Sequence, residues 1–127
     1  MKFVILMSEG SEAWAKLSPN DRAAVMERHA EFRRALEAAG KFVLSKQLAP
    51  AREARTVRRS GDGRISVTDG PFTESKEILG GYAIFEFATR EAAIESAKSF
   101  MELHRLYGEG WEGVCEMREL ATHCTDA

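Results

Sequence analysis

Two apolar strands restrict the folds open to this chain more than any other feature of its sequence. Residues 3–7 read Phe-Val-Ile-Leu-Met, and residues 82–87 read Tyr-Ala-Ile-Phe-Glu-Phe. Successive side chains of a strand point to opposite faces of a sheet, so both runs carry apolar side chains on both faces. A sheet that contains them must therefore be covered on both sides.

Two predicted helices can cover only one of these faces. Residues 18–21 read Ser-Pro-Asn-Asp, which is typical of a helix start, with Ser as the N-cap and Pro at the first helical position. An apolar stripe with helical spacing runs through residues 25–36, and Gly40 predicts the end of this helix. Thr89 is the predicted N-cap of a second helix, which we expect to end near residues 100–103.

The order of the predicted elements indicates an α+β fold. Further strands are expected at residues 42–44 and 114–120, and a hairpin over residues 56–68 turns at Ser-Gly-Asp-Gly. The chain thus alternates strand, helix, strand, hairpin, strand, helix and strand. This order is that of a ferredoxin-like antiparallel sheet with two helices on one face and an inserted hairpin.

The second face of this sheet predicts a homodimer. Left uncovered, it would form an apolar patch too large for a soluble monomer. A second copy of the same sheet, related by a two-fold axis, is the simplest cover. The 127 residues are most simply a single domain, which we assign to residues 1–120, followed by a short C-terminal tail at residues 121–127.

The composition argues against several classes of function. The formal net charge of −2 argues against nucleic-acid binding, and the arginines between residues 52 and 64 are expected to lie on a solvated hairpin. No apolar stretch approaches the roughly 18 residues that a membrane span needs. Two cysteines without metal-ligand spacing fit a reducing cytoplasm, where we expect the protein to reside. We expect neither a metal nor a cofactor.

The residues Asp-Gly-Pro-Phe at positions 69–72 form a turn sequence with an unusual continuation. Gly70 tolerates a positive φ, and Pro71 fixes its own φ and donates no N–H. A polar run and two glycines at residues 80–81 follow, and the glycines indicate a close backbone approach or a bulge. Residues 66–82 resemble the signature of the DGPF-domain branch of the YCII-related family. This resemblance implies a dimeric α+β barrel.

His29 lies on the apolar stripe of the first predicted helix. An imidazole buried there needs a hydrogen-bond partner, and its unperturbed pKa lies nearest to neutrality among the side chains. The residue is therefore either a structural histidine bonded to a backbone carbonyl or part of a site. YCII-related proteins carry a helical His eleven residues before a Gly and a following strand, an interval that His29 and Gly40 reproduce. The resemblance implies a general acid/base role for His29 within a His–Asp pair.

The Asp of such a pair is absent from the place where short YCII-related members carry it. Near the end of the second predicted helix this chain reads Phe-Met-Glu-Leu-His over residues 100–104. Asp69 of the signature is the candidate instead, because its carboxylate can orient an imidazole; the alternative is a turn in which it accepts backbone N–H groups. His104 stands in the place of the missing Asp. It either lines the same pocket or lies exposed at the helix end, where the macrodipole favours it.

Two hypotheses of function follow. In the first, the protein is an enzyme that transfers protons on a small organic molecule without a cofactor, with His29 as the acid/base and Asp69 as the residue that orients it. In the second, it is a non-catalytic ligand-binding or accessory protein that uses the same pocket. The residues expected to line this ligand pocket are His104, Phe72, Lys76 and Glu77. For the last two, an ion pair in a solvated loop is the alternative.

Overall fold

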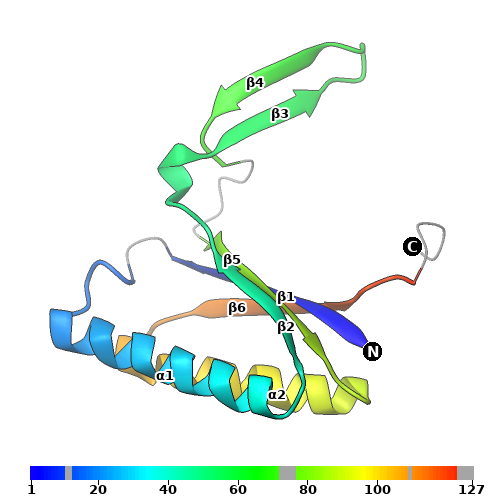
Figure 1. Cartoon of the computed structure of the whole chain (residues 1–127). Helices are drawn as coiled ribbons and strands as arrows, with labels where there is room; N and C mark the ends of the chain where they lie inside the picture. Colours follow the sequence, from blue (N-terminus) through cyan, green and yellow to red (C-terminus); the bar gives the residue numbers. More distant parts are fainter. Residues whose placement is uncertain (11–12, 72–76, 109, 123–127) are drawn as a thin grey trace.

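The computed structural model describes residues 1–10, 13–71, 77–108 and 110–122, which form a mixed α+β fold (Figure 1). The predicted helices and strands are confirmed, and α2 is prolonged by a 3-10 helix, η2, that the sequence pattern did not indicate. The elements in chain order are β1 (Lys2–Gly10), α1 (Pro19–Ala38), β2 (Phe42–Gln47), η1 (Ala51–Glu53), β3 (Arg55–Arg59), β4 (Ile65–Asp69), β5 (Glu77–Glu86), α2 (Arg90–Glu102), η2 (Leu103–Tyr107) and β6 (Gly113–Glu119).

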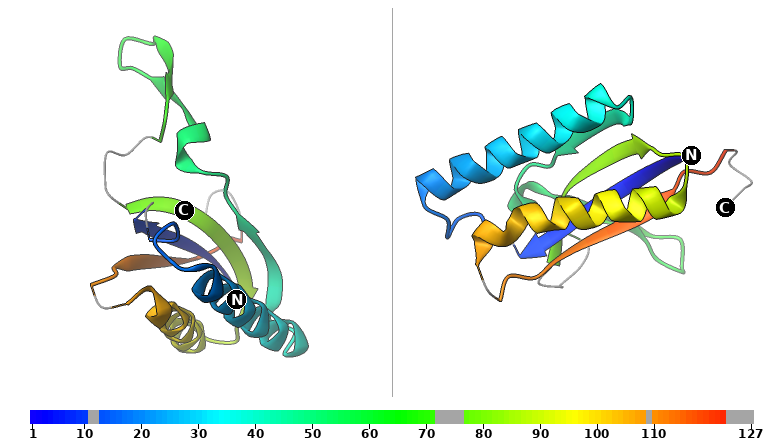
Figure 2. Two further views of the ribbon diagram at one scale, coloured as in Figure 1. Left: turned by 90° about the vertical axis from the view of Figure 1, so that its left-hand side faces the viewer. Right: turned by 90° about the horizontal axis from the view of Figure 1, so that it is seen from below.

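Four of the strands form one antiparallel sheet in the order β2-β5-β1-β6. Helices α1 and α2 lie on one face of it, as Figures 1 and 2 show from three directions. The sheet is open, because its edge strands β2 and β6 are not paired with each other, and the described residues close no barrel. None of the helices in these residues combines the length and apolar character needed to cross a membrane.

The ends of the helices follow the capping residues of the sequence. The hydroxyl oxygen of Ser18 accepts a hydrogen bond from the backbone N–H of Asp21 at 3.1 Å. The hydroxyl oxygen of Thr89 accepts one from the N–H of Ala92 at 3.1 Å. Gly40 follows α1 with a φ of 70°, the left-handed conformation in which glycine ends many helices. These caps fix where each helix begins or ends, and hence which residues face the sheet.

The core lies between the helices and the sheet. Alternate residues of β1 and β5 are buried there, among them Phe3 and Phe85. Leu36 of α1 and Ala93 of α2 belong to the same buried cluster. Burial of one such phenylalanine contributes about 1.5–3 kcal/mol to stability.

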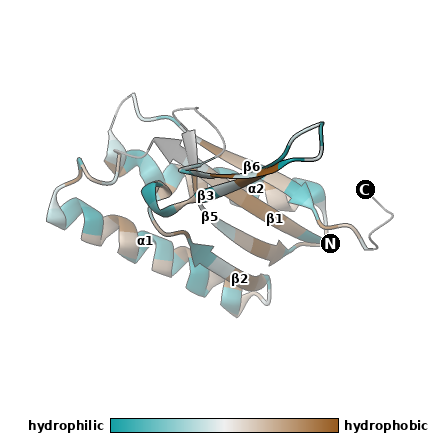
Figure 3. Cartoon of the chain, turned by 90° about the horizontal axis from the view of Figure 1, so that it is seen from above, coloured by the Kyte–Doolittle hydropathy of each residue, from teal (hydrophilic) through white to brown (hydrophobic). Residues whose placement is uncertain are grey.

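The other face of the sheet is apolar along β1 and β5, as predicted, and no helix of the described residues lies on it. Val4 lies opposite Ile84, Leu6 lies opposite Tyr82, and Leu44 flanks Ile84 from β2. All five side chains are half-buried in the single chain. Figure 3, viewed from this side, shows hydrophobic segments along β1 and β5. We call the surface formed by Val4, Leu6, Leu44, Tyr82 and Ile84 the open face.

The predicted hairpin is confirmed, and it stands apart from the main sheet. Strands β3 and β4 form a separate two-stranded sheet that projects on the side opposite the helices (Figures 1 and 2). Val57 lies opposite Val67, and Ile65 is two residues before Val67 on the same face. Val57 is 67% exposed, Val67 is 64% exposed and Ile65 is 70% exposed. A second apolar surface therefore rises beside the open face.

The chain re-enters the main sheet earlier than the apolar pattern indicated. Strand β5 begins at Glu77, whereas the pattern placed its start near residue 82. The register between β1 and β5 shifts so that Gly80 is the extra residue of a β-bulge. A Cβ on Gly81 would lie 3.0 Å from the carbonyl oxygen of Lys46. The two glycines thus serve both predicted purposes, a bulge and a close backbone approach.

Candidate functional site

Two histidines from distant parts of the chain meet between α1 and η2. Nε2 of His29, on α1, lies 3.2 Å from Nε2 of His104, on η2, and the two residues are 75 positions apart. His104 is 3% exposed, whereas His29 is half-buried. Nδ1 of His104 lies 3.0 Å from the carbonyl oxygen of Phe100, four residues earlier in the chain. The two imidazoles therefore form a hydrogen-bonded chain that ends on the backbone.

Aromatic rings hold His104 in place. Trp111 stacks on the imidazole with ring centroids 5.1 Å apart and an interplanar angle of 6°. Tyr107 stacks on it at 5.6 Å and 19°. The ring of Phe100 lies 5.0 Å from that of His104 and 5.3 Å from that of His29. These contacts leave the buried imidazole little freedom to turn.

Both imidazoles are neutral at pH 7. Burial and the neighbouring His104 lower the pKa of His29 from 6.5 to about 4. Burial also lowers the pKa of His104, and hydrogen bonds to the backbone of Phe100 and Met101 oppose this effect. A second imidazolium at this distance would be repelled by the first. The pair is therefore suited to accept a single proton.

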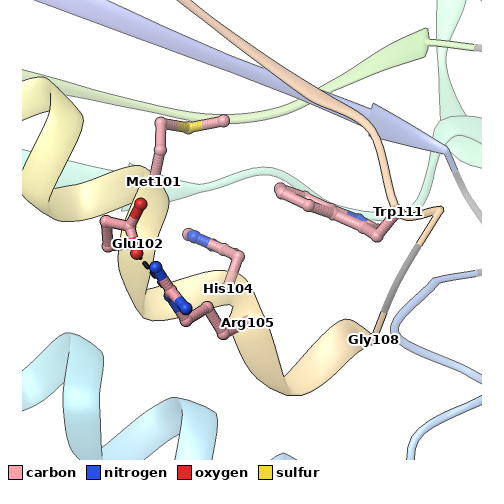
Figure 4. Close-up of a pocket in the computed structure, with 6 residues that line it drawn as sticks. All are labelled: Met101, Glu102, His104, Arg105, Gly108 and Trp111. Atoms are coloured by element: carbon pink, nitrogen blue, oxygen red, sulfur yellow. Dashed lines mark hydrogen bonds and ion pairs between the residues drawn. The ribbon is translucent and has the colours of Figure 1, made fainter.

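A cavity of about 250 Å³ lies beside His104 (Figure 4). Figure 4 shows the indole ring of Trp111 close to His104, and the ion pair of Arg105 with Glu102 along the same helical segment. Nε1 of Trp111 is the one buried side-chain nitrogen or oxygen of the described residues that lacks a hydrogen-bond partner. The lining residues are Met101, Glu102, His104, Arg105, Gly108 and Trp111.

A larger cavity of about 470 Å³ lies between α2 and β6. Its apolar lining includes Ile94, Met101 and Met117, and it also contains the thiol of Cys115. Burial raises the pKa of this thiol, so the group is protonated at neutral pH and is not a nucleophile. The groove is therefore suited to bind an apolar group, with Lys98 and Glu102 as the charged residues of its lining.

The structure places Asp69 away from the histidines. Asp69 ends β4, its side chain is 87% exposed, and its carboxylate pairs with the guanidinium of Arg55 at 3.1 Å. The hairpin that carries it projects from the face of the sheet opposite the helices (Figure 1). Within one chain, the hydrogen-bond partner of His29 is therefore His104. Of the pocket residues expected from the sequence, Phe72, Lys76 and the side chain of Glu77 lie outside the described residues.

The sequence carries a signal for this site that lies outside the motifs. His29 and His104 were both candidates, but nothing in their local sequences pairs them. Phe100, His104 and Tyr107 recur at intervals of three or four residues, the spacing of one helical face. A histidine within such an aromatic stripe indicates a packed imidazole rather than an exposed one at a helix end. The structure confirms burial for His104.

The histidine pair does not by itself make a metal centre. Zinc sites in proteins use three or four side-chain ligands. In the part of the chain that the structure describes, no three His, Cys, Asp or Glu side chains converge on one point. Here the two facing nitrogens are hydrogen-bonded to each other, so neither is directed at a shared metal position.

Comparison with known proteins identifies the family. Residues 1–101 match the YCII-related domain, a span that contains His29 and residues 66–82 and ends before His104. The chain is also 34% identical, over 88 residues, to the uncharacterised protein R00369 of Rhizobium meliloti (strain 1021), an alignment that covers 69% of this chain and 68% of that protein. The chain therefore belongs to the YCII-related family.

Proposed function

We propose that this protein is an enzyme that removes a proton from a small organic molecule, with His29 as the general base. The observation that carries the proposal is the 3.2 Å contact between Nε2 of His29 and Nε2 of His104. Imidazoles with a perturbed pKa and a fixed partner are typical of sites that transfer protons. Because the pKa of His29 is lowered to about 4, the ring is neutral at pH 7 and can accept a proton. The proposed reaction requires no cofactor.

The properties of His29 favour a class of substrate. A weakly basic nitrogen removes protons efficiently only from groups that are already acidic, such as a C–H beside a carbonyl. The rings of Phe32 and Phe100 lie next to each other, with centroids 5.5 Å apart, on the side of α1 that carries His29. They favour a substrate with an apolar body. We therefore propose small carbonyl compounds with an acidic C–H as the substrates.

Hydrogen exchange in D₂O tests this function and does not require that the product be identified. A panel of small carbonyl compounds is incubated with the protein, and the loss of each C–H signal is followed by proton NMR. We expect at least one compound to exchange with the wild type, and the exchange to be lost in His29→Gln. Glu31→Gln, an exposed change on the same helix, is the matched control and should retain the exchange. Equal exchange by wild type and His29→Gln would refute the role of His29.

A non-catalytic binding function is the second candidate, and the groove between α2 and β6 favours it. This cavity of about 470 Å³ has the size of sites for small organic ligands and is lined by Ile94, Met101 and Met117. His29 does not line it. A compound that raises the melting temperature of the wild type and of His29→Gln equally, without any C–H exchange, would favour binding over catalysis.

We also propose a cytoplasmic homodimer, built from two ferredoxin-like sheets that pair through their open faces into a dimeric α+β barrel of the DGPF type. The open face supports this assembly, because no helix in the described part of the chain covers its five apolar side chains. The exposed apolar face of the hairpin supports it too, because an isolated two-stranded hairpin is marginally stable in water. The free thiol of Cys115 fits a reducing compartment.

Light scattering tests the assembly. The wild type should have twice the mass of one 14.1 kDa chain at micromolar concentration. Leu6→Lys places a charge in the middle of the open face and should yield folded monomers. Glu31→Lys is the control, because it adds the same residue at an exposed, already charged position of α1, on the other side of the sheet. A wild type with the mass of one chain would refute the dimer.

A further inference from the structure

The hydrogen bond to Phe100 decides which nitrogen of His104 carries a proton. A backbone carbonyl oxygen can only accept, so Nδ1 of His104, 3.0 Å away, must be the donor. A neutral imidazole has one N–H. Nε2 of His104 therefore carries a lone pair, and it faces Nε2 of His29 at 3.2 Å. The opposite tautomer would set the lone pair of Nδ1 against that of the carbonyl oxygen.

This arrangement in turn fixes the tautomer of His29. The lone pair on Nε2 of His104 needs a donor, and the facing atom is Nε2 of His29. Nε2 of His29 therefore carries the proton, and Nδ1 of His29 carries the lone pair. Nδ1 of His29 has no hydrogen-bond partner among the described residues. It is also not buried, because Nε1 of Trp111 is the only buried side-chain nitrogen or oxygen of these residues that lacks a partner. Nδ1 of His29 thus faces solvent or a ligand.

The packing around His104 keeps this orientation. Trp111 and Tyr107 both stack on the imidazole, at interplanar angles of 6° and 19°. Trp111 can take this position because residue 113 is a glycine: a Cβ on Gly113 would overlap the indole ring. A buried ring packed against these aromatics cannot exchange its two nitrogens without breaking its hydrogen bonds to Phe100 and His29.

We infer that His104 is a positioning residue, which holds His29 in its Nε2–H tautomer so that Nδ1 of His29 is the nitrogen that takes a proton from the substrate. The inference rests on the proposed function of His29. When Nδ1 of His29 gains a proton, an N–H bond forms there, the C–H bond of the substrate breaks, and its electron pair stays on the substrate as an enolate. The proton on Nε2 of His29 can then move to Nε2 of His104. The N–H bond at Nε2 of His29 breaks, and a new one forms at Nε2 of His104. The positive charge moves to His104, which remains bonded to the carbonyl of Phe100.

NMR of the ring nitrogens in the wild type at neutral pH tests the tautomers directly. Nitrogen–proton correlation spectra should show a single Nδ1–H form for His104 and a single Nε2–H form for His29. The Nδ1–H form is the less populated tautomer of a free histidine side chain in water, so its presence alone at His104 requires the carbonyl acceptor. Substitution of His29 and of the third histidine, His123, by Gln assigns the signals. An Nε2–H form or a mixture at His104 would overturn the inference.

Alkylation with bromoacetate tests the reactive nitrogen independently of any substrate. The reagent forms a C–N bond at the nitrogen that holds the lone pair and releases bromide, and the two carboxymethyl isomers are separable. In the native protein we expect about a tenfold excess of the Nδ1 product at His29, the ratio that one unmade hydrogen bond would impose. Urea-denatured protein is the control and should lose this excess. Equal yields in the native protein, or no reaction at His29, would overturn the inference.

Two substitutions separate positioning from packing. His104→Phe keeps an aromatic ring against Trp111 and removes the acceptor, so the excess of the Nδ1 product should disappear. His104→Gln restores an acceptor oxygen and should recover part of the excess. Persistence of the full excess in His104→Phe would show that His104 does not set the tautomer. Correct tautomers without any C–H exchange in D₂O would instead contradict the proposed function and leave the positioning role established.

Discussion

The wild-type protein should lose stability between pH 7 and pH 4 to a greater extent than a His29→Phe variant. The pKa of His29 is about 4 in the folded chain and 6.5 without the fold. As the pH falls below 6.5, the unfolded chain binds a proton at this site and the folded chain does not. The stability associated with the neutral ring is therefore present above about pH 6.5 and is lost progressively until the pH reaches about 4.

The lowered pKa of His29 sets the size of the expected loss of stability. A change from 6.5 to about 4 corresponds to about 3.4 kcal/mol, at about 1.36 kcal/mol for each pKa unit. The ring of His29 is only half-buried, so water screens part of this term. Between pH 7 and pH 4, we expect the free energy of unfolding of the wild type to fall by about 1–2 kcal/mol more than that of His29→Phe.

Urea denaturation at a series of pH values measures this difference. The free energies of unfolding of the wild type and of His29→Phe are compared at one fixed protein concentration, because an assembly would make them concentration-dependent. The variant keeps an aromatic ring beside Phe100, and all carboxylates are common to both proteins, so their titration cancels in the difference. Parallel curves between pH 7 and pH 4 would refute the perturbed pKa of His29.

Three substitutions test the local structure around the site and the helix ends. Gly113→Ala places a Cβ against the indole ring of Trp111 and should destabilise the fold by about 1–3 kcal/mol, with a changed near-ultraviolet circular dichroism; an unchanged spectrum would contradict the packing. Thr89→Ala removes the acceptor for the N–H of Ala92 and should cost about 1 kcal/mol in urea denaturation, whereas Thr89→Ser should retain most of the stability. Gly40→Ala puts a Cβ at a φ of 70° and should cost about 1–2 kcal/mol, and a neutral effect would show that the turn relaxes.

The elements that the sequence predicted well depend on interactions within a few residues. Ser18 and Thr89 each accept a hydrogen bond from the N–H three residues later, so the helix starts follow from local chemistry alone. The open face was equally predictable, since alternation along a strand places Val4 and Leu6 on one side whatever the partner strand is. The start of β5 was less predictable, because the bulge at Gly80 interrupts the alternation on which the prediction relied.

The sequence by itself determined the two helices and the sheet with its two apolar faces, it named His29 as a candidate site residue, and it placed this chain close to the YCII-related signature. Only the tertiary structure decided that His29 meets His104, 75 residues away, and that Asp69 pairs with Arg55 on the projecting hairpin. The physical reason is that caps and strand alternation act over three or four residues. The partner of a buried imidazole depends instead on how α1 and η2 pack. No residue spacing within either segment encodes which residues of the two segments meet.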